Sequence, residues 1–139
     1  MRVLVDTCVW SLALRRQNKA LLHAEERRLS ELLSEAIRDG RVVMIGPVRQ
    51  ELLSGIRDKA QFAKTQGLLE PFEDEELTTA DYVAAARCFN LCRARGVQWG
   101  GIDMLLCAVA ARRHCAILTS DQGLLRCIEV LRAEKVLMP

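Results

Sequence analysis

The chain has 139 residues, of which 50% are hydrophobic and 27% are charged, and its formal net charge is +2 at pH 7. This length suits a single domain with a sizeable core, spanning residues 1–139, and the composition excludes a disordered chain. No apolar run reaches the roughly 18 residues of a membrane span, and no signal-peptide pattern follows Met1, so we expect a cytoplasmic protein without membrane contact.

Short apolar runs and amphipathic helical patterns alternate along the chain. Val3–Val5 is rich in β-branched residues and too short for a helix, which predicts a buried strand ending at Asp6. Further strands are expected at residues 41–45, 115–119 and 135–138. Apolar spacing and capping residues predict helices at residues 7–16, 21–38, 47–56, 58–69, 78–95, 102–111 and 120–132. The acidic run 73–76 is typical of a solvated loop.

Strands that are separated by helices, without hairpin turns, predict a parallel sheet. The expected fold class is α/β, with the sheet lying between two helical layers. In such sheets ligands bind at the carboxyl ends of the strands. Asp6 and Asp121 each follow an apolar strand directly, so chain topology predicts both carboxylates at this edge.

Two further acids stand out by their surroundings. Glu51 lies three residues after Val48 and is predicted to fall on the inward stripe of its helix. Asp103 opens an apolar run that contains no other charge before Arg112, so an unpaired carboxylate there would be costly. Structural roles remain open for each acid: a helix-start residue for Asp103, a cap or turn for Asp121, and ion pairs for Asp6 and Glu51.

Four carboxylates that meet without a basic partner repel one another and raise each other's pKa. A hard cation removes this repulsion, and all-oxygen ligands select Mg²⁺ or Mn²⁺. We therefore expect one or two such ions at this edge, held by Asp6, Glu51, Asp103 and Asp121.

These motifs in this order resemble the PIN-domain ribonucleases, and the chain's size resembles the VapC toxins of toxin-antitoxin pairs. The shared segments are an apolar strand before Asp6-Thr7, Glu51-Leu52-Leu53-Ser54-Gly55, Asp103 before an alanine-rich helix, and Leu118-Thr119-Ser120-Asp121. The resemblance covers nearly the whole chain. It implies a three-layer α/β/α sandwich with a parallel sheet of about five strands.

The resemblance also implies a function. The four acids occupy the catalytic and metal-binding positions of a Mg²⁺- or Mn²⁺-dependent endoribonuclease, and Thr7 and Ser120 supply supporting hydroxyls. Implied partners are RNA as substrate, a VapB-type antitoxin, a second copy in a homodimer, and operator DNA reached only through the antitoxin. The chain departs from many relatives after Asp121, where they continue with another acid and an aromatic and this chain has Gln122-Gly123-Leu124. It also departs at Gly46, where Ser or Thr often caps the helix.

Two other functions remain alternatives. A catalytically inactive PIN-like module would use the fold only to bind RNA or a protein partner. An acid-strand phosphotransfer enzyme would need a second acid where Cys8 stands, or a Lys after the last strand, and the sequence has neither.

Three further groups of residues have more than one possible role. Arginine pairs at 15–16, 27–28 and 112–113 suit phosphate contacts, although such pairs also occur on solvated helix faces. Trp99, beside Gly100, either stacks on an unpaired base or packs against the protein. The six cysteines contain no C-x-x-C pair; Cys88 and Cys92 could share a helix face at a zinc site, but we favour reduced thiols in the core.

Overall fold

The sheet has three parallel strands with β1 in the centre. A computed structural model describes residues 1–15 and 23–138 of the chain. Strands β1 (Val3–Val5), β2 (Val42–Val43) and β3 (Ala116–Leu118) are ordered β2-β1-β3. Both neighbours pair with β1 in parallel, so the carboxyl ends of all three strands meet at one edge.

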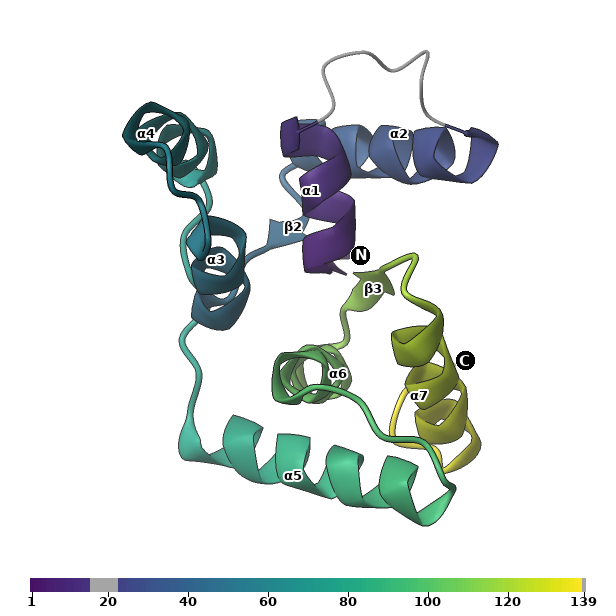
Figure 1. Ribbon diagram of the computed structural model, residues 1–139. Coiled ribbons are helices and arrows are strands. Elements are labelled where there is room, and N and C mark those ends of the chain that lie inside the picture. Colours follow the sequence, from purple (N-terminus) through teal and green to yellow (C-terminus); the bar gives the residue numbers. More distant parts are fainter. Residues whose placement is uncertain (16–22, 139) are drawn as a thin grey trace.

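Helices cover both faces of the sheet, as Figure 1 shows. On one side lie α1 (Thr7–Arg15) and α2 (Ala24–Arg38), which pack together. On the other side lie α5 (Thr79–Ala94), α6 (Gly101–Arg113) and α7 (Gln122–Ala133). Helices α3 (Gly46–Leu53) and α4 (Lys59–Leu69) follow β2 and flank the upper layer. The predicted three-layer α/β/α class is confirmed.

Helix α6 is the apolar centre of the lower layer. All residues from Met104 to Ala110 are buried, because α5 covers one side of the helix and β3 another. The absence of charge between Asp103 and Arg112 is explained by this burial on all sides. Asp103 is therefore the first polar side chain where the helix emerges at the sheet edge.

The predicted helices are confirmed with shifted ends. The predicted residues Arg16, Leu21 and Leu22 lie outside the described ranges. Helix α3 ends at Leu53 and not at Ile56, because Ser54 leaves the helical conformation with ψ 136° and Gly55 has φ 84°. A capping box between Thr78 and Asp81 starts α5.

The predicted sheet of about five strands is wrong in number, since the described residues contain three. Residues 135–138 form no strand: Lys135 has φ 60°, and the Val136 and Leu137 amides both donate to the Leu131 carbonyl oxygen, at 2.8 and 3.2 Å. Those amides are unavailable to β3. At the other edge, Asp74 makes only an isolated bridge to Met44.

A buried carboxylate ties α5 to α6. Asp81 is 0% exposed and accepts from Arg112 Nε at 2.9 Å and from two Arg113 nitrogens at 2.8 Å each. These guanidinium contacts hold the pKa of Asp81 well below its ordinary value. The arginine pair 112–113 is thus structural, at the opposite end of α6 from Asp103.

Five of the six cysteines are free thiols in the core. Cys88, Cys92, Cys107, Cys115 and Cys127 are buried, and burial raises the pKa of each. The expectation of reduced core residues fits this placement. Among the helices described, none combines the length and apolar character needed to cross a membrane.

Candidate active site

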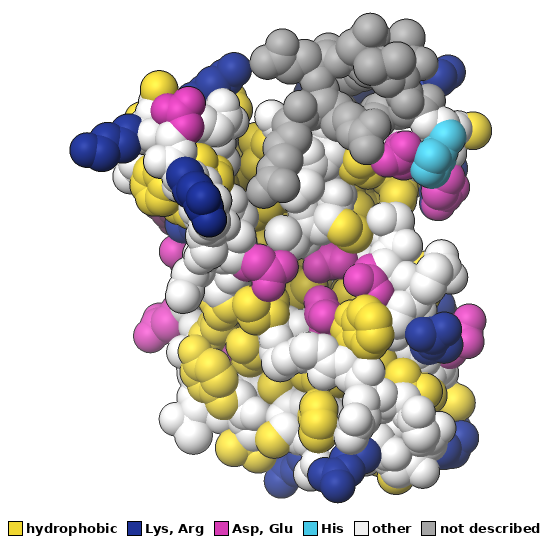
Figure 2. Space-filling model, viewed as in Figure 1, with side chains coloured by type: hydrophobic (Ala, Val, Ile, Leu, Met, Phe, Trp, Pro, Cys, Tyr) yellow, Lys and Arg dark blue, Asp and Glu magenta, His cyan; other side chains and the backbone are white. Residues whose placement is uncertain are grey.

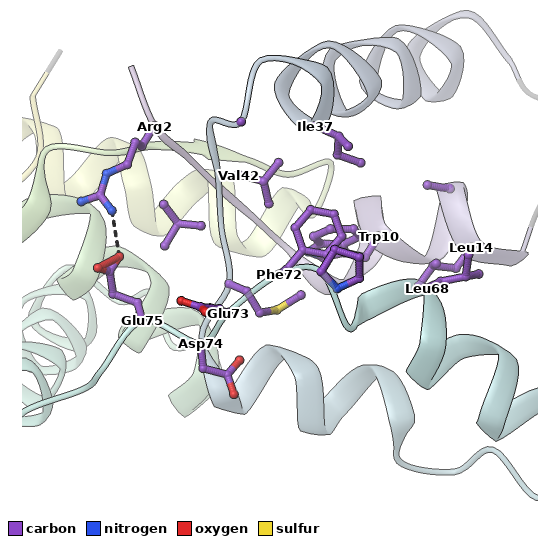
Figure 3. A pocket seen from close by; sticks show the side chains of 15 residues that line it. Arg2, Trp10, Leu14, Ile37, Val42, Leu68, Phe72, Glu73, Asp74 and Glu75 are labelled. Atoms are coloured by element: carbon purple, nitrogen blue, oxygen red, sulfur yellow. Dashed lines mark hydrogen bonds and ion pairs between the residues drawn. The ribbon is translucent and has the colours of Figure 1, made fainter.

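Four carboxylates gather at the carboxyl edge of the sheet, and we call them the acidic cluster: Asp6, Glu51, Asp103 and Asp121. Asp6 follows β1, and its amide donates to the Leu118 carbonyl at 2.9 Å, which fixes the two strand ends side by side. Asp121 follows β3, and Asp103 lies in the first turn of α6. On this face Figure 2 shows acidic side chains together at mid-height, with Lys and Arg toward the margins.

Asp6 is the most firmly held member. It is 5% exposed, and its Oδ1 accepts from the Thr7 amide at 2.8 Å. Its Oδ2 accepts from the Thr119 hydroxyl at 2.7 Å and from the Cys8 thiol at 3.2 Å. Burial raises the pKa of Cys8, so this neighbour is a neutral thiol and not a competing anion.

Thr119 is a site residue that the sequence argument missed. It is 7% exposed, donates to Asp6 and accepts from the Asp121 amide at 3.0 Å, so it links two acids. The register of the two strands indicates this role, because Val5 pairs with Leu118 and Thr119 therefore lies opposite Asp6.

The two hydroxyls predicted to support the site have other surroundings. Thr7 reaches Asp6 through its amide, and its buried Oγ1 has no partner among the described residues. Ser120 donates to Cys8 Sγ at 3.4 Å and contacts Asp6 only through that thiol. Their predicted role remains a proposal.

Asp121 has a structural role as well as a place in the cluster. Its Oδ1 caps α7 by accepting from the Leu124 amide at 3.0 Å. No group in the described part of the chain binds its Oδ2. One oxygen therefore holds the helix, while the second remains available for a ligand.

The surroundings of Asp103 destabilise its charged form. Burial, followed by the charges of Asp6, Asp121 and Glu51, raises its pKa to about 7. No hydrogen bond or ion pair to a described residue offsets this, although Asp103 does lie in the first turn of α6, where the helix-start alternative places it.

Glu51 belongs to the cluster by charge but is not inward-facing. Its side chain is exposed, whereas Val48 and Leu52 on the same helix are buried. The inward prediction was wrong because Glu51 lies about 60° from Val48 and about 100° from Leu52 around the helix axis, so it falls beside the buried stripe that these two residues define. Glu51 instead lies on the flank of α3, close enough to raise the pKa of Asp103.

We expect Asp103→Asn to match or exceed the wild-type melting temperature at pH 8 in chelator. A carboxyl whose folded pKa is raised loses stability as pH climbs from about 4 to about 7. The amide avoids this loss, worth about 1 kcal/mol after allowance for solvent screening. Thermal melts at pH 5 and pH 8 provide the measurement. A variant that is equally destabilised at both pH values would show that Asp103 is purely structural.

Fold and site together define a class: a three-layer α/β protein with an all-carboxylate site at the carboxyl edge of a parallel sheet. The chain belongs to the PIN domain family, whose model matches residues 3–128. PIN domains are generally nucleases, and they typically use divalent metal ions.

The fold also matches a solved structure. The chain is similar to the crystal structure of FitAcB from Neisseria gonorrhoeae, with a TM-score of 0.69 and 20% sequence identity over 91% of this chain and 93% of that chain. At this identity the likeness concerns the fold alone. No curated protein matches the chain.

Proposed function

We propose that the chain is a Mg²⁺- or Mn²⁺-dependent endoribonuclease that acts as the toxin of a VapBC-type pair. The observation that carries this proposal is the acidic cluster, in which three carboxylates raise the pKa of a fourth and no basic side chain among the described residues lowers it. Such repulsion is unfavourable for folding and favourable for cation binding.

The donor set fits a hydrated hard cation. Within residues 1–15 and 23–138, no three His, Cys, Asp or Glu side chains form a compact ligand group. Mg²⁺ does not require one, because it keeps several waters and binds through one or two carboxylates plus substrate phosphate. Asp103 and the unbound oxygen of Asp121 would provide direct ligands, with Asp6 and Glu51 contacting the ion or its waters.

The chain's own residues would then prepare the site for phosphodiester cleavage. A bound divalent ion polarises the phosphate and lowers the pKa of a bound water. Thr119 and the Thr7 amide hold Asp6 in one orientation, so this carboxylate need not reorganise during the reaction. Glu51, exposed on α3, leaves the cluster open to a strand of RNA on that side.

RNA cleavage should disappear in EDTA and return with excess Mg²⁺ or Mn²⁺. The reason is that four carboxylates without an ion repel a phosphate and provide no positive charge to stabilise the leaving oxygen. Cleavage of a labelled RNA, followed on gels with and without chelator, tests this. Undiminished cleavage in EDTA would rule out the metal mechanism, and absence of cleavage in every buffer would favour the inactive RNA- or partner-binding module.

The proposed toxin function implies further binding partners. A VapB-type antitoxin would block the acidic cluster, in keeping with its concentration of negative charge, and would connect the pair to operator DNA. A homodimer is proposed on the same family resemblance. The phosphotransfer alternative is the weaker one, because Cys8 occupies the position of the second acid and donates to Asp6.

A further inference from the structure

Trp99 lies where the side chain of residue 123 would be. A Cβ built on Gly123 would come within 2.5 Å of the indole carbons Cε2, Cζ2 and Cη2, which is closer than any real contact. The indole benzo ring therefore packs directly on the backbone of Gly123, the second residue of α7. Only glycine allows this approach.

This contact places an aromatic ring beside the acidic cluster. Trp99 directly precedes Gly100, the N-cap of α6, and a Cβ on Gly100 would lie 3.4 Å from the Asp103 carboxylate. Gly123 follows the α7 cap Asp121 by two residues. The ring thus bridges the starts of the two helices that carry Asp103 and Asp121.

The ring is not buried by this packing. Trp99 keeps 36% of its surface exposed, whereas Trp10, the chain's other tryptophan, is 2% exposed in the core. A purely structural role for Trp99 explains its contact with Gly123. It does not explain why part of the apolar ring is exposed to water next to the carboxylates. An uncharged flat partner suits that surface, because the neighbouring acids repel further phosphates.

We propose that Trp99 is a stacking platform for an unpaired base of the RNA strand whose phosphate lies at the acidic cluster. The inference rests on the proposed function and specifies its substrate: single-stranded or looped RNA, whose bases are free to stack. Stacking accepts any base, so the platform would contribute affinity and strand selectivity more than sequence selectivity. Gly123 is a positioning residue, because its lack of a side chain lets the Trp99 ring pack on the backbone of α7.

The test measures binding of a dye-labelled RNA by fluorescence anisotropy in Ca²⁺, because the variants at position 99 lack the tryptophan. Trp99 fluorescence of the wild type is recorded in the same titrations, and RNA integrity is checked after each one. The probe is a mixed-sequence single-stranded RNA of about 12 nucleotides, compared with the same strand annealed to its complement. We expect quenching by the single strand and not by the duplex. Trp99→Ala should weaken binding about 10-fold, which corresponds to about 1.4 kcal/mol, while Trp99→Phe should retain most of the affinity.

A pair of glycine variants separates stacking from folding. Gly123→Ala should displace the ring and reproduce the Trp99→Ala loss, whereas Gly101→Ala, whose added Cβ meets nothing within 4 Å, should bind like the wild type. In cleavage assays KM should rise with kcat little changed. Wild-type affinity in Trp99→Ala would overturn the stacking role and leave the nuclease proposal intact. No RNA binding by the wild type would overturn both.

Discussion

Asp6→Asn is expected to fold normally and to lose RNA cleavage by about 100-fold or more, the scale of removing one preorganised electrostatic contributor. The fold should survive because an amide can occupy the same contacts. Its oxygen would accept from the Thr7 amide, and its nitrogen would donate to the Thr119 hydroxyl. The charge is lost, the Thr119 hydrogen bond reverses its direction, and the Cys8 thiol loses its acceptor at Oδ2.

Growth of a bacterial host provides a second measurement for the same variant. Expression of the wild-type chain should slow growth, whereas Asp6→Asn should not. Glu129→Gln is the matched control, since it removes an exposed carboxylate on α7 outside the cluster and should preserve both cleavage and growth arrest. Equal arrest by wild type and Asp6→Asn would disconnect toxicity from the acidic cluster.

Asp81→Asn should produce the largest loss of stability, about 3 kcal/mol, because it removes the buried charge that two arginines contact. This is the lower end of the range for a broken buried ion pair, since Arg112 is partly exposed. For a domain with roughly 5–15 kcal/mol of stability, this lowers the melting temperature by about 10 °C. The capping box of α5 and the link to the end of α6 weaken together. Thermal or urea unfolding at pH 7 measures the effect.

The pH dependence distinguishes this ion pair from general destabilisation. Because the folded pKa of Asp81 is lowered, its contribution is complete above the ordinary Asp pKa of about 4 and disappears as pH falls through the folded value. The gap between wild type and Asp81→Asn should therefore narrow in acid. Asp39→Asn, which removes an exposed pair with Arg41, serves as the control and should barely change the melting temperature. A gap that stays constant with pH would contradict this account.

Topology made part of the site predictable. An acid that follows a parallel strand can lie only at the carboxyl edge, so Asp6 and Asp121 were located without any knowledge of packing. Asp103 was marked by the absence of other charge on a helix that the structure buries on all sides. Both arguments use features that are local in sequence.

Features that depend on finer geometry were not predictable in the same way. Glu51 was assigned to the inner face from its spacing to Val48 alone, but Leu52 shifts the centre of the buried stripe away from it. The predicted last strand does not form, because the Val136 and Leu137 amides donate to the Leu131 carbonyl oxygen. The hydrophobic pattern of the sequence does not predict this contact. The burial of the Asp81 charge could not be predicted from nearby residues, since its arginine partners are 31 and 32 positions away in the sequence.

The pairing of β1 with β3 has a consequence for synthesis. Thr119 reaches Asp6 across 113 positions of chain, and no nearer segment brings these groups together. At ribosomal rates of roughly 5–20 residues per second, Asp6 emerges about 10 s before the strand that completes its surroundings. Until then the nascent chain carries Asp6, Glu51 and Asp103 without the scaffold that unites them. The acidic cluster is therefore complete only when synthesis of the chain is almost finished.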